Sequence, residues 1–144
     1  MGDPMTDDEW RAFVLSGTRT GKLGVVRPDG RPLVVPIWFI IDDDGLIRFQ
    51  TSAGSAKVRA LRHDPRVCLT VDDEVAPYSF VLIEADAEVE PDDPAELWRV
   101  AHACAARYMG ADRADEYARR NAVDGECVVA LRPRRVIAER DVSA

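Results

Sequence analysis

Apolar segments of strand length recur along the chain, and residues typical of turns separate them. Pro28-Asp29-Gly30 and Asp42-Asp43-Asp44-Gly45 are two such turns. The segments predict six or seven strands, which together would form a small barrel. The expected strands are Lys22–Arg27, Leu33–Ile41, Leu46–Ser52, Arg66–Asp72, Tyr78–Val89, Glu126–Leu131 and Val136–Arg140.

Helical spacing replaces this pattern in three places. Thr6 with Glu9 three residues later forms a capping-box pattern, and Trp10 begins an apolar stripe after it, so residues 6–16 are expected to form a helix. A short basic helix is expected after Ser55, and further helices within residues 92–121. We therefore expect a mainly β fold with α decoration. It would be one domain over residues 1–144, with the main barrel strands and the basic helix in 22–89 and closing strands in 126–140.

Composition narrows the class of protein. A chain of 144 residues can bury roughly 68% of its unfolded surface in a single core. The net charge of -7 argues against broad binding to nucleic acid or to an anionic membrane. No apolar segment approaches the roughly 20 residues of a membrane span. The first residues are acidic and lack the apolar stretch of a secretory signal. These features predict a cytoplasmic protein.

Cysteines and histidines offer no metal site. Cys68, Cys104 and Cys127 lie far apart without a Cys-x-x-Cys pair, so we expect structural thiols in a reducing compartment. His63 and His102 have no matched ligand spacing, and no metal is expected. Asp42–Asp44 resembles the start of a calcium loop, but the later ligands are missing.

The segment Phe49–Pro65 carries the clearest candidate chemistry. It combines a strand end, a turn with serine and glycine, and a short basic helix. Backbone N–H groups at a helix start attract anions, because they have no intrahelical partner. The hydroxyls of Thr51, Ser52 and Ser55 and the ammonium of Lys57 lie close in sequence to that start. The segment therefore predicts a site for the phosphate of a cofactor.

A simpler interpretation of the same residues is a solvated lysine beside an ordinary helix cap. Thr51 and Ser52 would point to opposite faces of a regular strand, so their hydroxyls diverge unless the strand ends at Ser52. Arg59 and Arg62 could extend the positive field, or simply lie in solvent. Trp38-Phe39 is similarly ambiguous: it would be core or subunit interface, or it would line a planar ring.

Several residues together resemble the pyridoxamine-phosphate-oxidase-like proteins, the flavin-binding split-barrel superfamily. The matching series is Phe49, Thr51, Ser55, Lys57, Leu61 and Pro65. The order of the neighbouring segments Leu23–Arg27, Pro36-Ile37-Trp38-Phe39 and Asp64-Pro65-Arg66-Val67 is similar as well. The resemblance covers roughly residues 22–89. Its closest likeness is to the branch that uses the deazaflavin coenzyme F-420.

The resemblance implies a six-stranded antiparallel Greek-key split β-barrel that forms a two-fold homodimer. Two cofactor sites would lie in clefts at the interface. The phosphate would contact Lys57 and the hydroxyls of Thr51, Ser52 and Ser55. The tricyclic ring would lie along Val35, Pro36, Ile37 and Trp38, and Pro77 and Tyr78 of the partner chain would close the site.

The implied activity is transfer of hydride from reduced F-420 to a conjugated small molecule. No catalytic residue is assigned, and a proton could come from Tyr78 or from water. Oxidation of vitamin B6 is not expected, because Arg132-Pro133-Arg134-Arg135 does not reproduce the C-terminal Arg/His motif and Leu33–Pro36 lacks the extra phosphate-binding arginine. Ala85 also stands where many relatives have glycine. The alternatives are an FMN-binding oxidoreductase and a non-enzymatic carrier or sensor of a flavin or haem-like ring.

Overall fold

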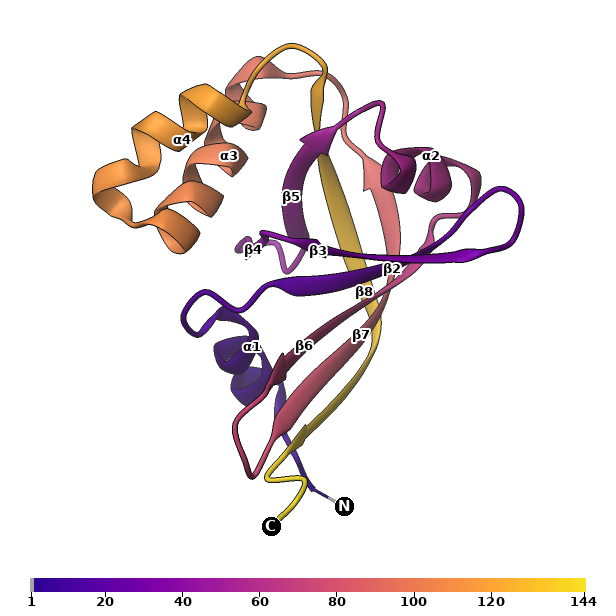
Figure 1. Cartoon of the computed structure of the whole chain (residues 1–144), viewed down its shortest axis with the longest axis vertical. Coiled ribbons are helices and arrows are strands. Elements are labelled where there is room, and N and C mark those ends of the chain that lie inside the picture. Colours follow the sequence, from indigo (N-terminus) through magenta and orange to yellow (C-terminus); the bar gives the residue numbers. More distant parts are fainter. Residues whose placement is uncertain (1) are drawn as a thin grey trace.

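The computed structural model describes residues 2–144 and consists of a curved antiparallel sheet with helices around it (Figure 1). Its strands are β1 (Asp3–Pro4), β2 (Gly21–Val26), β3 (Pro32–Ile37), β4 (Ile40–Ile41), β5 (Ile47–Ser52), β6 (Arg66–Asp73), β7 (Ser79–Val89) and β8 (Glu126–Arg140). Its helices are α1 (Asp7–Leu15), α2 (Ala56–His63), α3 (Pro94–Met109) and α4 (Ala114–Asn121), and a 3-10 turn, η1 (Ala111–Arg113), precedes α4. The prediction of a mainly β chain with helical decoration is confirmed.

The strands are ordered β3-β2-β6-β7-β8-β5-β4, and β1 pairs with β8. Every pairing is antiparallel. β3 and β4 lie at opposite ends of this order, yet Trp38 and Phe39 alone separate them in the chain. The two edges of the sheet are therefore joined by two residues, which closes the sheet into a partial barrel.

The single strand expected over residues 33–41 is wrong, because the chain leaves the sheet at Trp38 and Phe39. The carbonyl of Phe39 accepts a hydrogen bond of 2.8 Å from the guanidinium of Arg107, and its N–H donates to the hydroxyl of Tyr108 at 3.4 Å. Both partners lie on α3. Because these side chains satisfy the backbone of Phe39, the strand ends here without leaving buried polar groups unpaired.

The core lies inside the curved sheet and is built from alternate residues of its strands. Leu23 of β2 and Phe49 of β5 are almost completely buried, as expected from period-two patterning. Trp10 of α1 and Leu61 of α2 pack into the same cluster. Burial of these side chains, each contributing about 1.5–3 kcal/mol, holds the two helices on the sheet.

The two N-terminal helices begin where the sequence predicts. Thr6 accepts a hydrogen bond from the N–H of Glu9, and the carboxylate of Glu9 accepts one from the N–H of Thr6, so the capping box is confirmed. Ser55 caps α2 by accepting from the N–H of Val58 at 3.3 Å. Among the helices of residues 2–144, none combines the length and the apolar character that a bilayer crossing requires.

The last strand is longer than expected. Two strands were predicted on either side of Arg132-Pro133-Arg134-Arg135, but β8 is continuous and pairs with β7 along most of its length. Glu84 of β7 pairs with Arg135, whereas the next residue, Ala85, pairs with Pro133, so Arg134 is the extra residue of a β-bulge. The bulge accommodates Pro133, which cannot donate to the ladder.

Helices α3 and α4 form a separate layer that covers the bend between β3 and β4. The indole of Trp38 stacks on the ring of Tyr108, and it packs with a small cluster around Val100, Cys104 and Val128. Burial raises the pKa of the Cys104 thiol to about 12. The expectation of structural thiols does not extend to Cys68, which is exposed on the outer face of β6.

Candidate functional site

Four of the predicted phosphate contacts lie at or just before the first turn of α2. Thr51 and Ser52 end β5, Ser55 caps α2, and Lys57 is the second residue of the helix. The first intrahelical bond is donated by Arg59, to the carbonyl of Ser55. The N–H of Val58 is taken by the Ser55 hydroxyl, so the N–H groups of Ala56 and Lys57 are the ones of the first turn left for an anion.

The hydroxyls at this site differ in their access to a ligand. Thr51 faces the core and is 8% exposed, whereas Ser52 is exposed on the opposite face. The Ser55 oxygen already accepts the capping bond from Val58, but its own O–H can still donate. The hydroxyls of Thr51 and Ser52 thus diverge, so a single anion would not contact all three hydroxyls.

Lys57 supplies a positive charge that its own chain does not neutralise. It is half-buried and has no carboxylate partner among residues 2–144. Burial raises the pKa of the Cys127 thiol, and the positive charges of Arg62 and Lys57 oppose that rise. Both cations therefore lie within electrostatic reach of Cys127 on β8.

A narrow groove of about 290 Å³ lies beside this turn, with Ala53, Arg62 and Cys127 on one wall. Its remaining charged lining residues are acidic: Glu90, Asp92, Asp93 and Glu126. These carboxylates would repel a phosphate, since like charges in close proximity are unfavourable. The helix start is therefore a more favourable place for an anion than this groove.

The predicted ring wall on β3 divides between two faces. Val35 and Ile37 point toward the core, and Pro36 is exposed on the outer side. The indole of Trp38 stacks on Tyr108 with ring centroids 5.2 Å apart and planes 5° from parallel. One face of the indole is thus occupied within the chain, so a ligand along this segment would meet the outer side of β3 and its backbone.

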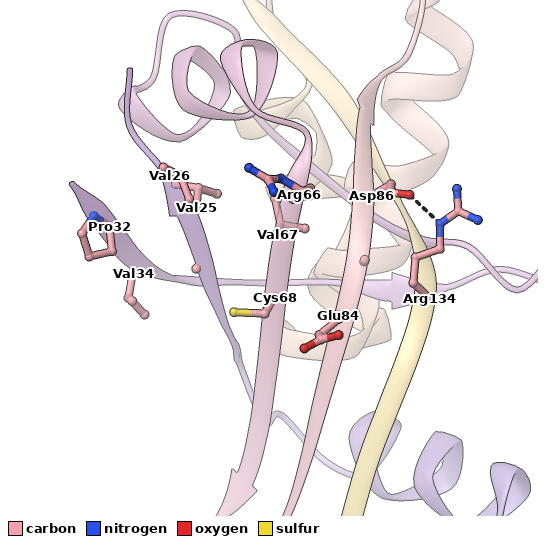
Figure 2. A pocket seen from close by; sticks show the side chains of 12 residues that line it. Val25, Val26, Pro32, Val34, Arg66, Val67, Cys68, Glu84, Asp86 and Arg134 are labelled. Atoms are coloured by element: carbon pink, nitrogen blue, oxygen red, sulfur yellow. Dashed lines mark hydrogen bonds and ion pairs between the residues drawn. The ribbon is translucent and has the colours of Figure 1, made fainter. Parts of the chain in front are cut away.

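An apolar hollow lies on the outer face of β3, β2, β6 and β7 (Figure 2). We call it the outer groove; its volume is about 510 Å³. Val26, Pro32 and Val34 form one side of it, and Val34 is 65% exposed. Within one chain, the outer face of β3 is therefore open to solvent at Val34.

Charged residues surround the outer groove on the side of β6 to β8. Asp86 accepts a hydrogen bond from the guanidinium of Arg134, which the bulge in β8 brings to it (Figure 2). Arg66 and Glu84 lie nearby. The sequence did not single out this groove. Its signal was the pair of outward-facing valines, Val26 and Val34, on two strands that pair with each other.

Pro77 and Tyr78 lie far from Lys57 in the same chain. They belong to the turn between β6 and β7 at the lower end of the molecule, whereas α2 lies at the upper end (Figure 1). Tyr78 is 48% exposed. One chain therefore brings the α2 residues together, but it does not bring Tyr78 to them.

Comparison with solved structures supports the same architecture. A conserved hypothetical protein from Mycobacterium tuberculosis is 29% identical, with 97% of this chain and 89% of that chain covered and a TM-score of 0.81. A protein described as an F-420 reductase is 26% identical, with 87% and 94% covered and a TM-score of 0.66. The haem storage protein HutZ from Vibrio cholerae shares the fold at 18% identity, with 92% and 94% covered and a TM-score of 0.72.

The family model described as pyridoxamine 5'-phosphate oxidase matches residues 6–139. This match extends from the capping box of α1 to the end of β8, and it includes the first turn of α2 and the outer groove. The resemblance inferred from residues 22–89 is confirmed over almost the whole chain. The protein belongs to the pyridoxamine 5'-phosphate oxidase family.

Proposed function

We propose that this protein binds the deazaflavin coenzyme F-420 and acts as an oxidoreductase that transfers hydride to a conjugated small molecule. The observation that carries the proposal is the first turn of α2. There, the ammonium of Lys57, the hydroxyls of Ser52 and Ser55 and the N–H groups of Ala56 and Lys57 lie close together along the chain at a helix start. This set of donors fits a phosphate. The likeness to a protein described as an F-420 reductase favours a deazaflavin as its carrier.

The outer side of β3 would support the ring of the cofactor. In this proposal Val35, Pro36, Ile37 and Trp38 form the ring wall, with the exposed Pro36 and the backbone of the segment in contact with the ring. The stack of Trp38 on Tyr108 then holds the end of the wall in place. Reduced F-420 supplies a hydride when it is bound, and the chain contributes binding, orientation and the exclusion of water.

A second copy of the chain would complete the site. The outer groove exposes apolar side chains. It also carries two basic residues, Arg66 and Arg134, and two acidic residues, Glu84 and Asp86. A second copy related by a two-fold axis can therefore pair opposite charges across the groove. In such a homodimer Pro77 and Tyr78 would close the cofactor site of the partner chain; within their own chain, their turn lies at the end of the molecule away from α2. Tyr78 or water would then supply a proton, and no other catalytic residue is assigned.

Two other functions fit the same fold. An FMN-binding oxidoreductase would use the same phosphate contacts with a different tricyclic ring. A non-enzymatic carrier would hold a flavin or a haem-like ring in the cleft; the shared fold of the haem storage protein is the observation behind it.

Fluorescence titration of the purified protein with F-420 and with FMN separates these functions. Saturable binding of F-420, much tighter than binding of FMN, is expected. Tight binding of FMN without a response to F-420 would contradict the proposal. Turnover of reduced F-420 with a panel of quinones and enones then distinguishes an enzyme from a carrier, which would bind the cofactor without oxidising it.

A further inference from the structure

The turn between β6 and β7 holds Tyr78 in an unfavourable backbone conformation. The φ angle of Tyr78 is 60°, in the left-handed region. A bulky residue avoids this region because its Cβ approaches the following carbonyl oxygen. The side chain is nevertheless 48% exposed, so burial of the ring in its own chain does not explain the conformation. Other contacts must hold it in place.

The end of the chain provides these contacts. Residues 141–143, which we call the C-terminal clasp, lie beside the turn at the lower end of the molecule (Figure 1). The N–H of Val142 donates to the carbonyl of Tyr78 at 2.9 Å, and the N–H of Ser143 donates to the carbonyl of Pro77 at 2.9 Å. The clasp therefore binds the backbone at Tyr78 and at the residue before it.

Two side-chain hydrogen bonds extend the clasp. The hydroxyl of Ser143 donates to the carbonyl of Pro77 at 3.2 Å, and the hydroxyl oxygen of Ser79 accepts from the N–H of Asp141 at 3.3 Å. The residues on both sides of Tyr78 are thus bound to the same short segment. Tyr78 and Val142 also line one shallow groove of about 330 Å³, so the ring and the clasp share a surface.

We propose that the C-terminal clasp is a positioning element, which holds Tyr78 so that its ring projects from the chain into the cofactor site of the partner chain. The inference rests on the proposed function, because the role of the ring depends on a cofactor in the dimer. Four hydrogen bonds from the clasp fix the turn, while the ring that it carries stays available at the surface. Ser79, Val142 and Ser143 act through Tyr78 and do not touch the cofactor themselves.

Coupling between the clasp and Tyr78 tests this role. The double variant Ser79→Ala/Ser143→Ala removes both side-chain bonds, and Val142→Pro separately removes the N–H that donates to Tyr78. Tyr78→Asn removes the ring but keeps a residue that tolerates the left-handed region. Arg119→Ala is the control, since Arg119 is an exposed residue of α4, which lies at the upper end of the molecule away from the turn (Figure 1). Dissociation constants for F-420 are measured for each variant, alone and combined with Tyr78→Asn.

We expect the clasp variants to raise the dissociation constant by about three- to tenfold when Tyr78 is present, and to cause no further rise with Tyr78→Asn, as for coupled neighbours. An equal rise in both backgrounds, or none in either, would overturn the positioning role. If Lys57→Ala weakens binding and the clasp variants do not, the clasp inference alone fails. Absence of binding of both F-420 and FMN by the wild-type protein would overturn the proposed function, and the role of the clasp with it.

Discussion

The indole of Trp38 and the phenol ring of Tyr108 stack almost in parallel. The hydroxyl of Tyr108 also accepts a hydrogen bond from the N–H of Phe39, which lies 69 residues earlier in the chain. The same hydroxyl donates to the carbonyl of Arg19 at 2.8 Å. One side chain of α3 therefore fixes the bend between β3 and β4 and the loop before β2. This relationship closes the barrel and determines the direction of the predicted ring wall.

Removal of the Tyr108 hydroxyl should destabilise the fold without abolishing it. Tyr108→Phe loses two hydrogen bonds but keeps the stack, and we expect the free energy of unfolding to fall by about 1–2 kcal/mol. Tyr108→Ala also loses the stack and should cost about 3 kcal/mol or more. Urea denaturation measures both values. Tyr117→Phe is the control, because the Tyr117 hydroxyl has an exposed bond to Arg113. Equal stability of Tyr108→Phe and wild type would contradict the assignment.

Lys57 should determine the affinity for the cofactor but not the stability of the fold. Lys57→Ala removes a charge-assisted hydrogen bond to the phosphate, and we expect binding to weaken by about 1.5–3 kcal/mol, or roughly 10- to 150-fold in the dissociation constant. Fluorescence titration with F-420 measures the change. Arg119→Ala makes the same change of charge on α4, outside the proposed site, and should leave affinity unaltered. Unchanged affinity in Lys57→Ala would place the phosphate elsewhere.

The outer groove should mediate dimerisation. Val34→Glu puts a charge on its apolar side, and the variant is expected to sediment as a monomer where the wild type sediments as a dimer, because an unpaired charge is costly to bury. Val123→Glu, at an exposed valine between α4 and β8, is the matched control.

The reactivity of Cys68 gives an independent measure of dimerisation, because this residue lines the outer groove. We expect a thiol reagent to modify Cys68 more slowly in the dimeric wild type than in Val34→Glu. A wild-type protein that stays monomeric at high concentration, or equal labelling rates in the two proteins, would argue against this interface.

Acid should weaken a charge network that joins β5, α3 and the turn before β5. The guanidinium of Arg48 contacts Asp42, Asp44 and Glu90 at 2.6–2.7 Å. A hydrogen bond from Arg99, reinforced by one from Arg48, lowers the pKa of the Asp42 carboxyl despite its burial. Because the folded-state pKa lies below the unfolded value, this stabilisation is present above the unfolded value and is lost as the pH falls through the folded value.

Asp42→Asn should therefore reduce the free energy of unfolding at pH 7 more than it does at about pH 3. Urea denaturation at the two pH values measures the difference. Asp43→Asn provides the comparison, since Asp43 is exposed and has no ion-pair partner in the described part of the chain. A deficit of the same size at both pH values would show that the Asp42 carboxylate contributes through its shape rather than its charge.

Features that depend on residues three or four apart could be predicted from the sequence. The capping box of Thr6 and Glu9 and the cap of α2 at Ser55 form as expected, because a helix start is determined by side chains within one turn of it. The family motif around Lys57 was recognisable for the same reason. It occupies one continuous strand, turn and helix, whose order along the chain is also its order in space.

The tertiary structure decided the features that depend on distant partners. The strand over residues 33–41 breaks at Phe39 because Arg107 and Tyr108 satisfy its backbone, and β8 continues through Pro133 because its bulge fits β7. The hydrophobic pattern of either segment gives no information about the distant residues that pack against it. By itself, the sequence determined a mainly β chain and predicted a phosphate site at Lys57. Only folding placed Tyr78 at the far end of the molecule and exposed the outer groove, because strand pairing, which is not local, determines which surfaces meet.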